Sequence, residues 1–149
     1  MYAELHCLSH FSFLRGASAP AELVSRAAEC GYHALAVTDE CSLAGVVKAH
    51  VAAKEHQLKL IIGSEFTLTE GIRLVALVPN REAYGELSGL ISRARRRCHK
   101  GEYTVHLRDI IFHLKRCFLI LLPDDTHNQT VYFQQLTRLC KGRVWIGIS

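Results

Sequence analysis

The sequence predicts an α/β fold in which mostly parallel strands carry helices on their outer side. Apolar runs of strand length alternate with segments of helical periodicity along the chain. This alternation is typical of βαβ units, whose crossover helices pack against a parallel sheet. With 149 residues and a hydrophobic fraction of 49%, the chain can form one domain with its own core. We therefore expect a single domain over residues 1–149, with a sheet that is either open or curled into a barrel.

Each predicted element follows from its periodicity and from the residues that flank it. Pro20 stands where the first turn of a helix needs no N–H donor, and Gly31 ends that helix. Pro79 ends a later strand, and Asn80 can cap the helix that follows. The strands are expected at 2–8, 34–38, 59–62, 66–68, 73–78, 117–122 and 144–148. The helices are expected from Pro20 to Gly31 and at 43–57, 81–96, 107–115 and 130–140, with a turn at 123–125.

Composition argues against several classes of protein. A net charge of +4 and a pI near 8.8 are compatible with a nucleic-acid neighbour but do not require one. The six cysteines contain no CxxC pair, which favours reduced thiols in a cytoplasmic protein over a disulfide framework or a zinc ribbon. The first residues lack the regions of a signal peptide, and the longest apolar runs have only the length of a strand. We therefore expect neither secretion nor a membrane span.

Acids and histidines stand where three of the predicted strands end. His6 and His10 follow the first strand, Asp39 and Glu40 follow 34–38, and Glu65 follows 59–62. In parallel α/β folds the working side chains lie at the C-terminal ends of the strands. We therefore expect these side chains to share one rim, where they form a candidate metal site.

Four long stretches of the chain resemble a known family. They are ELHCLSHFSFLRGAS (4–18), ALAVTDECSLAGVVKAHVAAKE (34–55), LKLIIGSEF (58–66) and RLVALVPNREAYGELSGLISRARRR (73–97). They are similar to the PHP (polymerase and histidinol phosphatase) domain at the N-terminus of the bacterial DNA polymerase III alpha subunits, in particular the error-prone branch. The resemblance implies a distorted (β/α) barrel, of which this chain is the N-terminal portion. From about residue 115 onward the match is loose.

Active members of that family hold two or three divalent metals at the barrel rim. The resemblance places His6 at the first histidine of a His-x-His motif, Asp39 at the aspartate of an Asp-His pair, and Glu65 at the family glutamate. Glu40 replaces the histidine of the Asp-His pair, and a carboxylate can also bind a metal. These four residues are the candidate metal ligands. The alternative is that they form a polar network that only holds the strand ends together.

Other ligand positions of the family carry residues that do not bind metals. Leu8 stands at the second histidine of His-x-His, Arg15 at a family aspartate, and Arg73 at a further histidine. Guanidinium groups near Asp39 and Glu40 can stabilise clustered carboxylates in place of a cation. We therefore expect no tightly bound metal.

Two further groups have both a structural and a functional interpretation. A basic cluster closes the helix 81–96, and its members Arg93, Arg96, Arg97 and Lys100 follow helical spacing on one face. It is either a contact for DNA phosphates or an acidic partner, or a solvated helix end that complements the helix dipole. Phe11 and Phe13 are expected to be core anchors rather than platforms on which bases stack.

The resemblance leaves three functions open. In the first, the chain is a structural and interaction module of an error-prone DNA polymerase, a nucleotidyltransferase of DNA replication, DNA repair and translesion synthesis after DNA damage. The polymerase active site would then lie outside these residues. In the second, the chain is a divergent metal-dependent phosphoesterase of the 3′–5′ exonuclease or pyrophosphatase type. In the third, it is a truncated product with no function of its own, since an apolar strand at 144–148 ends the chain uncovered.

The first function determines the expected cofactors and partners. We expect no cofactor in this segment, Mg²⁺ in the parent polymerase, and at most weakly bound Zn or Mn at the PHP rim. The expected partners are DNA through the parent polymerase, the rest of the polymerase chain and other mutagenesis proteins. We expect no membrane contact and a cytoplasmic location.

Overall fold

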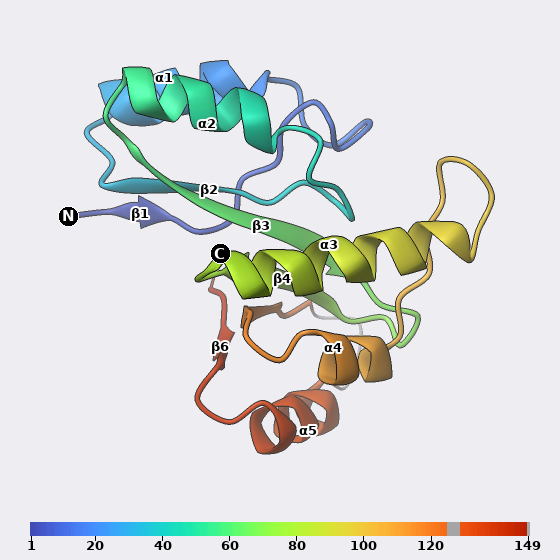
Figure 1. The fold of residues 1–149 in the computed structure, drawn as a ribbon. Coiled ribbons are helices and arrows are strands. Elements are labelled where there is room, and N and C mark those ends of the chain that lie inside the picture. The colour runs from blue at the N-terminus through green and yellow to red at the C-terminus, as the bar shows by residue number, and fades with distance from the viewer. Residues whose placement is uncertain (125–128, 149) are drawn as a thin grey trace. The chain divides into compact units, whose positions relative to one another are not determined.

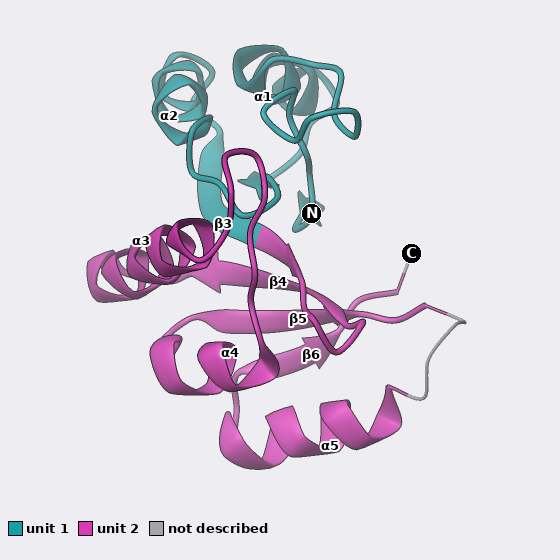
Figure 2. Ribbon diagram, turned by 90° about the vertical axis from the view of Figure 1, so that its right-hand side faces the viewer, with its two compact units in different colours: residues 1–64 teal, residues 65–149 magenta. Residues whose placement is uncertain are grey.

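The computed structural model describes residues 1–124 and 129–148, and the chain forms two compact units (Figure 2). The first unit is Met1–Ser64 and the second is Glu65–Ser149. Each unit is α/β, which confirms the predicted fold class. That the two units make one domain stays a prediction. None of the described helices is long and apolar enough to cross a bilayer.

The first unit contains three parallel strands and two helices (Figure 1). The pairs β1–β2 and β2–β3 are both parallel, with Ala3 opposite Ala34 and Val37 opposite Ile62. Helices α1 and α2 pack on this sheet through a core that includes Val24 and Leu35, which are almost fully buried. The elements are β1 (Ala3–Glu4), α1 (Pro20–Glu29), β2 (Ala34–Val37), α2 (Val46–Glu55) and β3 (Lys59–Thr67).

Local signals explain where α1 begins and ends. Pro20 occupies the first helical position, as predicted, and the Ala19 amide donates to Glu22 Oε2 at 2.7 Å. After the helix, Gly31 has a positive φ of 71°, a conformation that glycine adopts without a steric penalty. The chain then turns directly into β2.

The strands of the first unit differ from their predicted lengths. The first strand was expected over 2–8, but β1 pairs only at Ala3–Glu4, and the amides of His6 and Cys7 donate to side-chain oxygens. The two stretches expected at 59–62 and 66–68 form one nine-residue strand, β3, which passes from the first unit into the second. Gly63 therefore does not interrupt this strand.

The second unit contains a mixed sheet and three helices (Figures 1 and 2). Strands β4 and β5 are antiparallel, whereas β5 and β6 are parallel. The Asn80 side chain accepts a bond from the Ala83 amide at 2.9 Å, which is the predicted cap of α3. The turn expected at 123–125 lies partly outside the described residues. The elements are β4 (Arg73–Val78), α3 (Arg81–Arg96), α4 (Leu107–His113), β5 (Phe118–Leu122), α5 (Thr130–Leu139) and β6 (Val144–Ile146).

Candidate functional site

Asp39 is the centre of a buried hydrogen-bond network at the end of β2. Its side chain is only 2% exposed. Oδ1 accepts bonds from the Ser9 amide at 2.7 Å and from Ser12 Oγ at 2.8 Å, and Oδ2 accepts from Ser9 Oγ at 2.7 Å. Both serine side chains are buried as well. Three short bonds from one loop therefore satisfy both oxygens of this carboxylate.

The loop that supplies these donors, residues 9–18, is itself tightly folded. The Ser12 amide donates to the Ser9 carbonyl at 2.9 Å, and the Gly16 amide donates to the Ser12 carbonyl at 3.0 Å. A Cβ at Gly16 would lie 2.0 Å from the Ser9 carbonyl oxygen, so only glycine fits there. Leu14 has a positive φ of 60°, which is strained for a branched residue. The loop thus holds Ser9 and Ser12 toward Asp39 at some conformational cost.

Further contacts join this network to β3 and to the residue before α2. Ser12 Oγ accepts from the Glu40 amide at 3.0 Å, and Ser64 Oγ donates to the Asp39 carbonyl at 2.7 Å. On the remaining side, a Cβ at Gly45 would lie 3.1 Å from Asp39 Oδ2. The backbone before α2 therefore covers the oxygen that has only one donor.

Arg15 and Glu40 form an ion pair next to this network. Arg15 Nη1 lies 2.8 Å from Glu40 Oε2, and the two side chains are 32% and 25% exposed. This is the pairing expected of a guanidinium group that faces a carboxylate at a predicted ligand position. A divalent cation at Glu40 would compete with this contact.

The first histidine motif is fixed mainly through its backbone. The His6 amide donates to Glu4 Oε1 at 3.0 Å, and the amides of Cys7 and Thr38 each bond to the other residue. Burial, with smaller contributions from Glu4 and Asp39, raises the pKa of the Cys7 thiol to about 11. Cys7 is therefore a protonated thiol at neutral pH, and none of the six cysteines, all of which are described, forms a disulfide.

The predicted ligands fall in both units of the structure. His6, Leu8, Asp39 and Glu40 belong to the first unit, whereas Glu65 and Arg73 belong to the second. Glu65 is fully buried in β3, and Arg73 is the first residue of β4. That the six positions form one site stays a prediction.

The residues of the first unit do not fit a metal centre. Asp39 has its oxygens bonded to serine donors, Glu40 is paired with Arg15, and Leu8 has no donor atom. Within residues 1–124 and 129–148, no group of three or more His, Cys, Asp or Glu side chains is arranged to hold a metal ion. A metal ligated by Asp39 would have to share this carboxylate with the buried serine donors.

The basic end of α3 is only partly available to a ligand. Arg97, the residue that caps the helix, pairs through two nitrogens with the buried Asp109, at 2.5 and 3.0 Å. This guanidinium group lowers the pKa of Asp109 to about 2. Arg93 lies 3.3 Å from Nδ1 of His113, and Arg96 is exposed. Lys100 follows the helix rather than lying on its face, so the four residues do not form one helical stripe.

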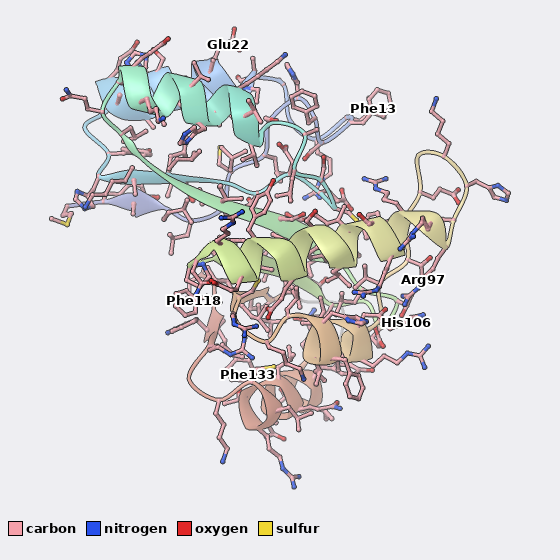
Figure 3. All side chains as sticks on the ribbon, viewed as in Figure 1. Phe13, Glu22, Arg97, His106, Phe118 and Phe133 are labelled. Atoms are coloured by element: carbon pink, nitrogen blue, oxygen red, sulfur yellow. The ribbon has the colours of Figure 1, made fainter. Side chains whose placement is uncertain are left out.

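Two features of the site loop could not be read from the sequence. Phe13 was expected to anchor the core, but its side chain is 84% exposed and points away from the ribbon (Figure 3). No role was expected of Ser9 and Ser12, yet both donate hydrogen bonds to Asp39. The sequence gives one weak signal for this role. Ser9 and Ser12 are small hydroxyl residues that stand shortly before Gly16, in a chain that also has an aspartate at a strand end.

Comparison of the sequence with known proteins gives a consistent result. The profile of the PHP domain matches residues 4–133. An error-prone DNA polymerase from Saccharophagus degradans is 56% identical over 149 residues, which cover 99% of this chain and 14% of that protein. An error-prone DNA polymerase from Teredinibacter turnerae is 51% identical over 148 residues, again 99% of this chain and 14% of that protein. The chain thus spans a small part of these relatives.

Solved structures with the same fold come from hydrolases. A candidate metal-dependent phosphoesterase from Bifidobacterium adolescentis superimposes with a TM-score of 0.75 at 16% identity, covering 98% of this chain and 76% of that protein. An amidohydrolase from Chromobacterium violaceum gives a TM-score of 0.69 at 16% identity, covering 97% of this chain and 76% of that protein. At such identity the likeness concerns the fold alone. The profile match over residues 4–133 shows that this chain belongs to the PHP domain family.

Proposed function

We propose that this chain is the PHP module of an error-prone DNA polymerase of the polymerase III alpha subunit family. The observation that carries the proposal is the 56% identity over 99% of the chain to one such polymerase. The parent enzyme would be a nucleotidyltransferase that copies damaged DNA, with Mg²⁺ bound in a polymerase site outside these residues. Its partners would be DNA, the rest of its own chain and other mutagenesis proteins. A cytoplasmic location is part of the same proposal.

Within that polymerase, the role of the module would be structural. The buried carboxylate of Asp39 accepts three bonds from Ser9 and Ser12, and Glu40 is engaged by Arg15. These contacts support a site in which hydroxyl and guanidinium groups satisfy the acids that metals satisfy in active PHP enzymes. The basic residues Arg93, Arg96 and Lys100 remain candidates for contact with DNA phosphates, whereas Arg97 is already paired with Asp109.

A chimeric polymerase tests the first part of the proposal. In the Saccharophagus degradans enzyme, the matching 14% of the chain would be replaced by these 149 residues. We expect primer extension across a template lesion at a rate close to that of the parent, because a structural module need only fold and dock. A soluble, folded chimera without polymerase activity would contradict the proposal.

Metal analysis tests the structural role of the module. The chain would be purified, incubated with Zn²⁺ or Mn²⁺, dialysed and analysed by plasma mass spectrometry. We expect less than one metal ion per chain. More than one equivalent retained through dialysis would refute the role assigned to Asp39. The double variant Leu8→His, Arg73→His is the matched gain-of-ligand control, because it restores two imidazoles at the family positions.

The alternative function is a metal-dependent phosphoesterase of the 3′–5′ exonuclease or pyrophosphatase type. It is supported by the fold of the Bifidobacterium adolescentis protein, which has a TM-score of 0.75. Release of phosphate from pyrophosphate, or of nucleotides from a 3′ end, in the presence of Mn²⁺ would favour it. The Asp39→Asn variant would have to lack that activity. Activity from a contaminating enzyme would not change with this substitution.

A further inference from the structure

The positive charge of the chain is concentrated at the end of α3 and in the loop that follows it. Residues 93–109, the basic segment, contain six Lys or Arg side chains and two Asp or Glu side chains. Their net charge of +4 equals that of the whole chain, so the remaining residues are neutral overall. Glu70, which accepts from the Leu107 amide, lowers the local charge only to +3. A local excess of this kind indicates a polyanionic partner.

Two arginines of the basic segment fix the shape of its loop. Arg95 Nη1 donates to the carbonyl oxygens of Gly101 and Glu102, at 3.2 and 3.4 Å. Arg97 Nη1 donates to the Thr104 carbonyl at 3.4 Å, in addition to the ion pair described above. The loop projects from the end of α3 before it returns to α4 (Figure 1). These bonds therefore hold the loop in one conformation against the end of the helix.

The other basic side chains of the helix end are available to a ligand. Arg96, His99 and Lys100 are exposed, and their side chains make no hydrogen bond or ion pair within residues 1–124 and 129–148. Arg93 is exposed too, and its Nη1 lies 3.3 Å from Nδ1 of His113, a neutral or basic group that does not offset its charge. Three permanent positive charges are thus presented by a preorganised segment, which lowers the entropic cost of binding.

The surroundings of these charges favour contact with phosphates over contact with a protein or with bases. Within residues 85–111, all of which are described, no large apolar side chain is exposed, so a protein partner would find no apolar anchor. Tyr103 is half-buried: its hydroxyl accepts from the Thr67 amide at 2.9 Å, and its ring centroid lies 5.4 Å from the Arg95 guanidinium carbon. The ring is therefore engaged within the unit rather than presented as a stacking platform for bases.

We propose that Arg93, Arg96 and Lys100 bind the phosphate backbone of duplex DNA without reading its sequence. Arginine suits phosphate oxygens because its planar fork donates two parallel hydrogen bonds. Duplex DNA carries one charge per about 1.7 Å of its axis, about twice the density of a single strand, so neighbouring cations gain more from the duplex. The inference rests on the proposed function for the identity of the polyanion. It adds a DNA contact made by the module itself.

Fluorescence anisotropy of the 149-residue chain with labelled DNA tests this proposal. The probes are a duplex of about 16 base pairs and one of its strands alone, and the duplex should bind about fivefold more tightly. Three phosphate contacts predict a slope of about −2.7 for the logarithm of the binding constant against the logarithm of the salt concentration. Raising NaCl from about 20 to about 80 mM should therefore weaken duplex binding about fortyfold. A second duplex of unrelated sequence should bind equally well.

Paired variants separate the basic segment from the overall charge of the chain. Arg96→Ala combined with Lys100→Ala should weaken duplex binding about tenfold at the lower salt concentration and reduce the slope to about −0.9. Arg96→Lys combined with Lys100→Arg keeps both charges and should retain most of the affinity. Arg81→Ala combined with Lys141→Ala is the matched control, because both residues are exposed, lie outside the segment and change the net charge by the same amount. This control should keep the slope of the natural chain.

Four results would overturn the proposal. They are no duplex binding at the lower salt concentration, tighter binding of the single strand, an equal loss in the control pair, and displacement of the duplex by polyglutamate as efficiently as by unlabelled duplex of the same total charge. The last result would make the segment a site for acidic proteins. A chimeric polymerase that extends primers, beside a module that fails to bind duplex, would refute this inference and leave the proposed function standing.

Discussion

Replacing Asp39 by alanine should strongly destabilise the first unit. The substitution removes the acceptor of the Ser9 amide, the Ser9 hydroxyl and the Ser12 hydroxyl, all of which are buried. A buried donor without a partner costs about 1–3 kcal/mol. The Ser12 hydroxyl still accepts from the Glu40 amide, and the carboxylate no longer has to be desolvated, so the separate costs do not simply add. We expect a loss of about 3 kcal/mol in the free energy of unfolding.

Urea denaturation followed by far-ultraviolet circular dichroism measures this loss. Glu40→Ala is the matched control, since it removes the neighbouring carboxylate and its partly exposed pair with Arg15 but leaves the serine bonds to Asp39 in place. Its expected cost is below about 1 kcal/mol. The reasoning would be refuted if Asp39→Ala cost no more than Glu40→Ala. It would equally be refuted if Zn²⁺ or Mn²⁺ raised the unfolding midpoint of the natural chain but not that of Asp39→Ala, because Asp39 would then hold a metal.

Three further predictions concern the second unit and the glycines. Arg97 lowers the pKa of Asp109 to about 2 from its ordinary 3.8, so the pair should stabilise the fold above about pH 4 and lose that contribution as the pH falls toward 2. Because Arg97 is partly exposed, this contribution is limited to about 1 kcal/mol. The free energy of unfolding of Asp109→Asn should therefore fall less between about pH 4 and about pH 2 than that of the natural chain. A Cβ at Gly85 meets nothing within 4 Å, so Gly85→Ala should stabilise α3 by about 0.5–1 kcal/mol. Gly16→Ala, in contrast, should prevent the loop 9–18 from closing. Thermal melting should therefore show a higher midpoint for Gly85→Ala and a lower one for Gly16→Ala. Burial raises the pKa of the Cys117 thiol to about 12, so a disulfide reagent should modify Cys117 only after unfolding. Peptide mapping that finds Cys117 modified in the folded chain as rapidly as the exposed Cys30 would contradict this burial.

Much of the fold could be predicted because local signals and tertiary packing agree. The range 73–78 of β4 and the range 81–96 of α3 match their predictions, since a proline and a capping asparagine separate two strongly patterned segments. The prediction was wrong where hydrogen bonding to a neighbouring strand, rather than the β propensity of the residues, decides the length of a strand. Residues 59–67 pair as one strand despite Gly63, and the first strand pairs over two residues only. Strand ends depend on which neighbour supplies hydrogen bonds, and a single sequence does not contain that information.

The place of Asp39 was predictable, but its contacts were not. The alternation of strands and helices placed Asp39 at the end of a buried strand, where it lies. The partners of Asp39 come from a loop with no periodicity, so nothing in the sequence indicated which side chains would turn inward. Ser12 turns in and is buried, whereas its neighbour Phe13 is left in solvent. Leu14, between them and Gly16, has a positive φ, which the sequence did not indicate either.

If the module has the structural role proposed above, the bonds around Asp39 would keep this loop folded without a bound metal. A buried carboxylate needs compensating donors whether or not a cation is present, because leaving it unsatisfied costs several kcal/mol. Ser9 and Ser12 supply three such donors from within the same unit, and Gly45 shields the remaining approach to Oδ2. The presence of leucine at position 8 therefore need not destabilise the rim. Through these bonds Asp39 anchors the loop 9–18.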